Sequence, residues 1–335
     1  AFFTEKDQLL ATGLQVSDFI TVDDSNARHQ GENGYVTHMG NDFFAWFGST
    51  ESKSRINFLE LLHAGSITYR VTDEALSYMQ EQGLAEALRG QLQTATPAEI
   101  ASPQQWQEHL QQLGILEERH QRIATEGALI GALLEKEDFN PDLAIISDGA
   151  GQFAILAHGL CWIHTERLVH KLIPMNDLQR AAVAQVRGQI WDLYADLKAY
   201  RLQPDASRIG ELEARFTAIC TQRTDYATLN GILKRTYRRK QEMLLVLRRP
   251  EVPLHTNGSE TDIRDYVKKR KISGGTRSDL GRTCRDTFAS LKKTCRKLGI
   301  SFWDYLIDRI SLANAIPPLP DIVRQRAGAY LGASP

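Results

Sequence analysis

The sequence has few of the features that mark secreted, disulfide-rich or membrane proteins. It contains no Cys-x-x-Cys pair, and its only cysteines are Cys161, Cys220, Cys284 and Cys295, which argues against a disulfide scaffold. No apolar run approaches the roughly 20 residues that span a bilayer, and the first residues lack a basic-then-apolar leader of the secretory type. We therefore expect an intracellular, cytoplasmic protein without a membrane segment.

Net charge is also nearly absent, but the total of −1 hides a division between the two halves of the chain. Residues 1–150 hold 9 Lys+Arg and 23 Asp+Glu, which gives −14, whereas residues 151–335 hold 31 and 18, which gives +13. Such an asymmetry indicates a polyanionic partner for the basic half. The alternative is an uneven spread of charge over one large globular domain.

Two apolar segments each end in an acidic residue. Residues 18–24 read Asp-Phe-Ile-Thr-Val-Asp-Asp, and residues 143–148 read Leu-Ala-Ile-Ile-Ser-Asp. Both patterns are typical of buried strands. If the strands are parallel neighbours, Asp23 and Asp148 lie side by side at the edge where open α/β sheets carry their sites. Taken singly, each Asp could equally be a turn or cap residue.

The remaining pattern predicts an α/β protein with two helical insertions. Residues 35–39 and 43–47 are predicted strands, and residues 54–62 are a predicted helix. We expect one domain over residues 1–310, with a core at about 15–65, 140–175 and 250–310, mainly helical insertions at about 70–138 and 176–248, and a C-terminal tail at 311–335.

Five ordered segments carry a family resemblance that covers roughly residues 15–310. They are Ile20-Thr-Val-Asp-Asp-Ser25, Ser147-Asp-Gly149, Cys161-Trp-Ile-His164 with Arg167, Asn257-Gly-Ser-Glu260 with Arg264, and Arg270-Lys-Ile-Ser-Gly-Gly275. Together they resemble the motifs of the insertion-sequence-66 family of bacterial transposases. The resemblance implies a ribonuclease-H-like mixed sheet flanked by helices and an Asp-Asp-Glu catalytic triad.

Carried over by position, the triad falls on Asp23, Asp148 and Glu260. The family pattern usually has a second Asn before the Glu segment and a basic residue after it, where this chain has Thr256 and Thr261. The triad implies Mg²⁺ or Mn²⁺, as two ions, for cleavage of a phosphodiester and strand transfer by a DNA 3′-hydroxyl. Another interpretation of Glu260 is a helix capping box with Asn257.

Cys161, His164 and Arg167 are expected to support the site. Cys-x-x-His is half of a zinc pattern, but no second half follows at a suitable spacing. The alternatives are a buried structural Cys and Trp, or a His164 that bonds near a catalytic carboxylate or a DNA phosphate.

A basic segment follows Glu260. Residues 261–300 contain 12 Lys+Arg against four acids, and Gly274-Gly275 predicts a helix stop. Lys and Arg supply most of the sequence-independent affinity for DNA, although a solvated helix face is the usual role of a charge run. The predicted DNA contacts are Arg264, Lys268, Lys269, Arg270, Lys271 and Arg277. Tyr266 and Trp303 are candidates for stacking on bases or for core positions.

These observations predict a DNA transposase that acts on transposon ends and target DNA and is nucleoid-associated when active. Two rivals remain: an inactive DNA-binding relic, and a metal-dependent phosphohydrolase, which would not explain the basic segment. We also expect a separate end-recognition module ahead of Ala1. Sequence specificity and a homo-oligomer on DNA are left open.

Overall fold

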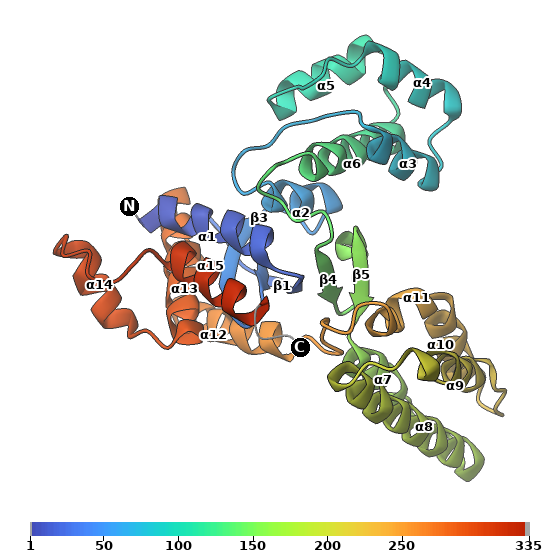
Figure 1. Cartoon of the computed structure of the whole chain (residues 1–335). Helices are drawn as coiled ribbons and strands as arrows, with labels where there is room; N and C mark the ends of the chain where they lie inside the picture. The colour runs from blue at the N-terminus through green and yellow to red at the C-terminus, as the bar shows by residue number, and fades with distance from the viewer. Residues whose placement is uncertain (1, 332–335) are drawn as a thin grey trace. The chain divides into compact units, whose positions relative to one another are not determined.

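The computed structural model describes residues 2–331 and has a mixed α/β fold, as predicted (Figure 1). These residues form fifteen α-helices and one five-stranded sheet. The chain divides into two compact units. The first unit consists of residues 1–17, 24–141 and 261–335, and the second unit of residues 18–23 and 142–260.

The strands follow the order β3-β2-β1-β4-β5 across the sheet. Their bounds are β1 Phe19–Asn26, β2 Tyr35–Gly40, β3 Ala45–Thr50, β4 Ala144–Ser147 and β5 Ala157–Leu160. Strands β2 and β3 pair antiparallel, whereas β4 pairs parallel with both β1 and β5. The parallel pairing predicted for the two acid-ended strands is therefore confirmed, and β5 is a strand that the sequence did not reveal.

Arg249 joins the beginnings of the two parallel strands of the second unit. Its Nη1 donates to the carbonyl oxygen of Asp142 at 2.8 Å, and its Nη2 donates to that of Asp18 at 3.2 Å. Both carbonyls lie just before a strand, so one guanidinium bonds to β1 and β4 at the end opposite Asp23 and Asp148.

In the first unit, helix α13 (Asp279–Leu298) covers the edge strand β3. Asp286, Ser290 and Thr294 are spaced four residues apart on this helix and accept hydrogen bonds from the backbone N–H groups of Ser49, Phe47 and Ala45 at 2.8, 2.9 and 3.1 Å. An open strand edge offers unpaired N–H groups for aggregation. Here side chains at helical spacing satisfy those groups instead.

The first unit also contains the acidic insertion, which is helical as predicted. Ser54 caps the predicted helix α2 by accepting from the N–H of Asn57, and α3 to α6 follow it. The bounds are α2 Arg55–Leu62, α3 Asp73–Glu81, α4 Glu86–Ala95, α5 Pro103–Gln112 and α6 Glu118–Leu134.

Both ends of the described chain are helical. Helix α1 (Phe2–Val16) precedes β1 and is an element that the sequence did not reveal. Its buried face includes Leu9, Leu10 and Leu14. Within the predicted tail, residues 319–331 form α15, which packs against α1.

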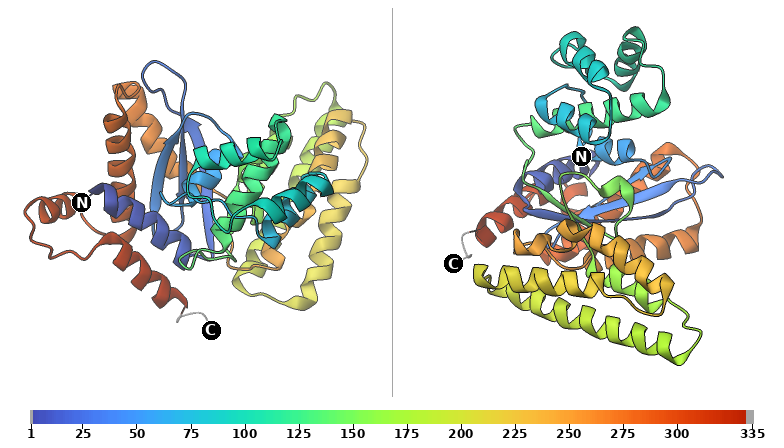
Figure 2. Two further views of the ribbon diagram at one scale, coloured as in Figure 1. Left: turned by 90° about the horizontal axis from the view of Figure 1, so that it is seen from above. Right: turned by 90° about the vertical axis from the view of Figure 1, so that its right-hand side faces the viewer.

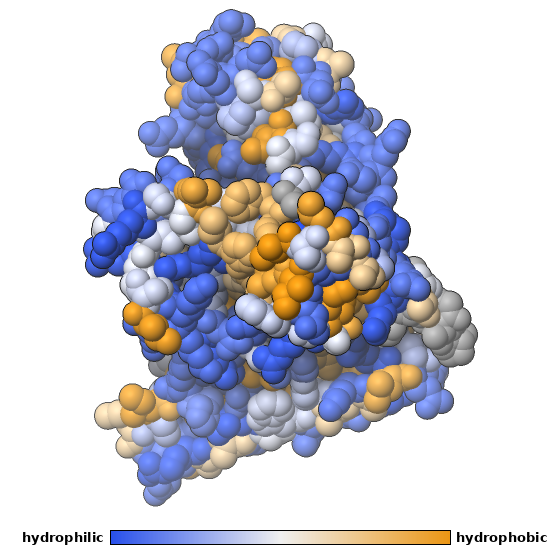
Figure 3. Space-filling view, turned by 90° about the vertical axis from the view of Figure 1, so that its left-hand side faces the viewer, coloured by the Kyte–Doolittle hydropathy of each residue, from blue (hydrophilic) through white to orange (hydrophobic). Residues whose placement is uncertain are grey.

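Helix α14 (Phe302–Ile310) carries an exposed apolar stripe. Ser301 caps it by accepting from the N–H of Asp304 at 3.3 Å. Trp303, Ile307 and Ile310 are exposed at the spacing of one helix face. Figure 3 views the molecule from the side on which Figure 1 labels α14, and apolar residues are gathered on that side. Trp303 is therefore not part of the core.

The second unit packs five helices around a core that is separate from the acidic insertion. Its helices are α7 Trp162–His170, α8 Asp177–Leu202, α9 Ile209–Thr221, α10 Ala227–Arg238 and α11 Lys240–Met243. Figure 2 shows the long α8 alongside α9. Trp162, Leu193, Leu197 and Phe216 lie in one buried cluster. No helix within residues 2–331 is long and apolar enough to cross a membrane.

Candidate active site

The β1–β4 register places two of the predicted acids level with each other. Phe19 pairs with Ala144 and Thr21 with Ile146, and this register, counted on by two residues, aligns Asp23 of β1 with Asp148, the residue directly after β4. Adjacent strands lie about 4.8 Å apart. Asp148 is exposed directly after β4, and its Oδ1 accepts from the N–H of Ala150 at 2.9 Å. The neighbouring Asp24 forms an ion pair with Lys53.

Glu260 lies in the first turn of helix α12 (Asn257–Ser273), and that turn is bonded to β1. The hydroxyls of Ser259 and Thr21 are 2.5 Å apart and buried. Thr21 stands two residues before Asp23, so this bond holds the start of α12 against the strand that carries Asp23. Thr256, and not Asn257, precedes the first helical residue, so Asn257 does not cap the helix as the alternative interpretation required.

The carboxylate of Glu260 contacts helix α7. Its Oε1 accepts from Nη1 of Arg167 at 3.2 Å and lies 3.5 Å from Nε2 of His164. The supporting residues predicted from the Cys-x-x-His segment are thus brought to Glu260.

Cys161 and His164 at the start of α7 influence each other's ionisation. Burial opposes ionisation of the Cys161 thiol, but hydrogen bonds with His164 and Thr256 outweigh it, so the pKa of Cys161 is lowered. The hydrogen bond to Cys161 raises the pKa of His164 against the effect of burial, and the negative charges of Glu260 and Asp148 raise it further. His164 therefore lies within electrostatic reach of two of the three predicted acids.

The three acids do not form a preassembled cluster. Within residues 2–331, no group of three or more His, Cys, Asp or Glu side chains is arranged to hold a metal ion. Glu260 is engaged with Arg167 and His164, while Asp23 stands on β1 and Asp148 directly after β4.

The profile of the transposase IS66 family matches residues 130–283. The chain is also 40% identical over 322 residues to the uncharacterized protein y4jO of Sinorhizobium fredii (strain NBRC 101917 / NGR234), a match that covers 95% of this chain and 100% of the relative. The chain belongs to the IS66 family of transposases. Membership supports an enzyme that cuts and transfers DNA, which makes DNA its implied partner. No solved structure matches the chain.

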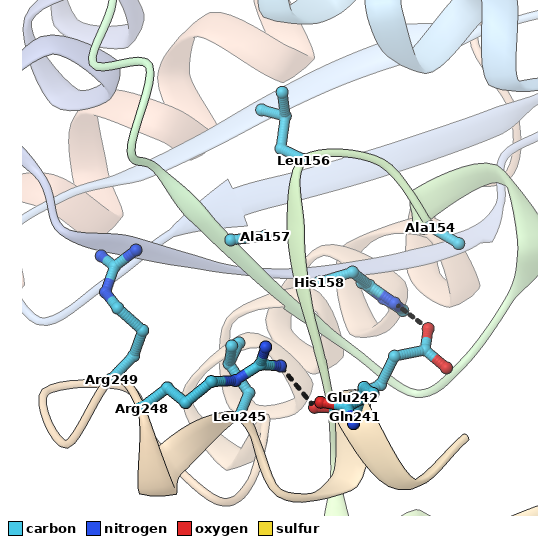
Figure 4. Close-up of a pocket in the computed structure, with 9 residues that line it drawn as sticks. All are labelled: Ala154, Leu156, Ala157, His158, Gln241, Glu242, Leu245, Arg248 and Arg249. Carbon is cyan, nitrogen blue, oxygen red and sulfur yellow. Dashed lines mark hydrogen bonds and ion pairs between the residues drawn. The ribbon is translucent and has the colours of Figure 1, made fainter. Parts of the chain in front are cut away.

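In this IS66-family chain, a hydrogen-bonded network lies behind the Asp148 turn. Ser147 Oγ accepts from the N–H of Gly149 at 3.0 Å and lies 2.8 Å from Nε2 of His158 on β5. His158 Nδ1 lies 2.6 Å from Oε1 of Glu242 on α11 (Figure 4). Arg239 bonds both oxygens of Glu242 and donates to the carbonyl oxygen of Gly149 at 3.1 Å. The network thus closes on the turn that carries Asp148.

Arg239 and His158 keep Glu242 ionised in this network. Burial would raise the pKa of Glu242, but Arg239 and His158 outweigh burial and lower it to about 2. An ionised Glu242 accepts from Nδ1 of His158.

Serine, histidine and carboxylate in this order also resemble a hydrolase triad. Ser147 is 0% exposed, and its oxygen already accepts from Gly149, so no substrate can reach it. The cavity of about 580 Å³ shown in Figure 4 is lined by His158 and Glu242 and not by Ser147. The network therefore positions the backbone around Asp148. No sequence signal marked His158 or Glu242, since they are distant in the chain.

The predicted DNA contacts of the IS66-family chain lie on α12 and after it. Arg264, Lys268, Lys269, Lys271 and Arg277 are exposed, whereas Arg270 is half-buried and its Nη1 lies 3.4 Å from the hydroxyl of Ser25. Helix α12 ends at Ser273 and Gly274 has a φ of 69°, so the predicted helix stop is confirmed.

Part of the basic segment has a structural role. Lys293 and Lys297 pair with Asp262 at 3.5 and 2.9 Å. Tyr266 is 5% exposed and donates to Oδ1 of Asp286 at 2.7 Å, so of its two alternatives the core position is confirmed and stacking on bases is excluded. The exposed cations of this segment are thus fewer than the charge count suggested.

Proposed function

We propose that this IS66-family chain is the catalytic region of a DNA transposase that cuts DNA and transfers the cut strand with Asp23, Asp148 and Glu260. The observation that carries the proposal is the parallel β1–β4 register, which, counted on by two residues, aligns Asp23 with Asp148 towards the carboxyl ends of the two strands. Open α/β sheets carry their sites at such ends. The hydrogen bond between Thr21 and Ser259 holds the first turn of α12, and with it Glu260, next to β1 in the second unit.

The strand order supports a ribonuclease-H-like fold for this region. The order β3-β2-β1-β4-β5, with an antiparallel β2–β3 pair and parallel β4 pairs, fits the mixed sheet that the family resemblance implies. In that arrangement the first acid stands on β1 and the second directly after β4, which are the positions of Asp23 and Asp148.

The donor set suits Mg²⁺ or Mn²⁺. Two carboxylates held level on neighbouring strands repel each other unless a cation lies between them. Hard cations take carboxylate oxygens and share their remaining positions with water and substrate phosphate. Asp23 and Asp148 would hold such ions, and Glu260 would join them on leaving Arg167. When bound, the ions supply activation of water and of a 3′-hydroxyl.

The chain's own residues prepare this site. Arg167 and His164 hold the Glu260 side chain in a fixed direction through contacts of 3.2 and 3.5 Å. The Ser147–His158–Glu242 network holds the backbone at Asp148. Arg167, when Glu260 turns away, is released to pair with a phosphate.

The test is cleavage and joining of transposon-end DNA by the Asp148→Ala variant with Mg²⁺. Asp192→Ala is the matched control, since Asp192 is also an exposed Asp of the second unit but lies on α8. We expect loss of both steps for Asp148→Ala and wild-type rates for the control. Strand transfer that survives in Asp148→Ala would refute the proposal.

A further inference from the structure

Helices α7 and α10 form the walls of an open cleft beside Asp148 in the second unit. Its volume is about 480 Å³. That is within the ~300–1,000 Å³ of small-molecule sites, so it can admit a segment of one nucleic-acid strand but not a whole duplex. The lining residues come from the end of β4, from β5, and from α7, α10 and the residues after them, and include Asp148, Gly149, Leu160, Arg167, Leu168 and Arg235.

The cleft is strongly cationic. Arg167, Lys171, Arg235 and Arg239 line it, and Asp148 is its only carboxylate. Arg167 and Arg239 are already paired with Glu260 and Glu242. Lys171 and Arg235 are exposed, and no acidic partner for either is found in the described part of the chain. Two positive charges in the cleft are therefore uncompensated.

Helix stability explains these two cations only in part. Lys171 directly follows α7, and Arg235 is in the last turn of α10, where positive charge is favourable to the helix dipole. A cation on any face of the last helical turn would interact equally well with the helix dipole. It does not explain why both side chains line the same cleft as Asp148.

We propose that this cleft binds the phosphates of the DNA strand that is cut at Asp148, with Lys171 and Arg235 as phosphate contacts. This inference rests on the proposed function of Asp148. Leu160 and Leu168 give the cleft an apolar surface against which a sugar can pack. Arg235 belongs to the second helical insertion, so the insertion supplies one wall of the path along which the strand reaches Asp148.

The test is the salt dependence of binding to a labelled single-stranded oligonucleotide, measured on the full chain in EDTA. Each phosphate contact to a single strand contributes about −0.7 to the slope of log K against log salt. We expect the Lys171→Gln, Arg235→Gln double variant to lose about 1.4 from the magnitude of that slope.

The matched control is the Lys198→Gln, Arg223→Gln double variant. Lys198 and Arg223 are an exposed Lys and Arg of the second unit that do not line the cleft. We expect the wild-type slope for this control. A cleft variant that keeps the wild-type slope and affinity would overturn the inference.

The two proposals can fail separately because binding is measured without metal. If Asp148-dependent cleavage is found and the cleft variant binds like the wild type, the cleft inference fails and the catalytic assignment stands. If the magnitude of the slope falls in the cleft variant but cleavage does not depend on Asp148, the phosphate contacts are supported. The claim that the bound strand is cut at Asp148 is then refuted.

Discussion

His158 Nδ1 lies 2.6 Å from Oε1 of Glu242, which bonds a side chain of the sheet's last strand to a helix at the end of the second insertion. On its other side, His158 is bonded to Ser147, the residue before Asp148. The insertion is thus connected to the Asp148 turn through the His158 imidazole, in addition to the Arg239 bond to the Gly149 carbonyl oxygen. A change in α11 reaches Asp148 without any contact to DNA.

Replacing Glu242 by Gln tests this connection. The substitution keeps the side chain's size but removes the charge that holds Arg239 and the Nδ1–H of His158. Loss of outer partners of a metal site typically costs about 10–100-fold in activity, and we expect a fall of this size in kcat for Mg²⁺-dependent cleavage with KM for DNA unchanged. Glu211→Gln, at an exposed position on α9, is the control. An unchanged kcat in Glu242→Gln would show that the network does not act on Asp148.

The lowered pKa of Glu242 predicts that the stability of the folded chain depends on pH. Its pKa is lowered from 4.5 to about 2 in the folded chain, so its stabilising effect is complete above about pH 4.5 and is lost as the pH falls through about 2. We therefore expect the difference in unfolding midpoint between the wild type and Glu242→Gln to shrink over that range. Urea unfolding at several pH values measures it. A difference independent of pH would contradict the ionised Glu242.

Thr21→Val tests the bond between β1 and α12. Valine matches threonine in shape but cannot bond to the Ser259 hydroxyl, which is 0% exposed and 2.5 Å from Thr21. We expect slower DNA cleavage through displacement of Glu260, together with a loss of stability of about 1–3 kcal/mol from the unsatisfied hydroxyl. The Thr21→Ser variant, which retains the hydroxyl, is expected to restore the rate. Equal rates for the Val and Ser variants would exclude this role.

Asp286→Ala tests how α13 protects the edge of the sheet. Burial raises the pKa of Asp286, although Lys6 and the hydrogen bonds of Tyr266 and Ser49 oppose that effect. The substitution leaves the Ser49 N–H, the Ser49 hydroxyl and the Tyr266 hydroxyl without their acceptor. We expect a loss of about 3 kcal/mol or more, measured by urea unfolding. Exposed Asp304→Ala on α14 should cost far less; equal losses would count against the edge contact.

The sequence predicted the parts of the site that follow from local pattern. An apolar run that ends in Asp marked both Asp23 and Asp148, and the Gly pair after α12 marked its end. The sequence missed β5, because Ala157–Leu160 is short and contains His158 and Gly159. It also missed the pairing of His158 with Glu242, which depends on how α11 packs against β5.

Charge counting was the weakest guide to the DNA surface. A sum over residues 261–300 does not separate cations that pair within the fold from those that face solvent. Lys293 and Lys297 belong to the first kind because Asp262 comes within reach when α12 and α13 fold. Arg264 and Lys269 belong to the second kind, since both are exposed. Arg235, outside that sum, stands in a basic stretch of the second insertion, and the structure adds that it lines the cleft beside Asp148.

The two hydrogen bonds from Arg249 to the carbonyl oxygens of Asp18 and Asp142 determine where residues can be inserted or deleted without moving the aspartates. Between Ala144 and Asp148, a single inserted or deleted residue would shift the strand by about 3.3 Å and turn its side chains to the opposite face. In the connection that contains α3 to α6, an inserted or deleted residue would leave the register of β4 unchanged, because the Arg249 bond to Asp142 fixes the position at which β4 begins. Whole helices can therefore be gained or lost there while the spacing of the two aspartates stays fixed.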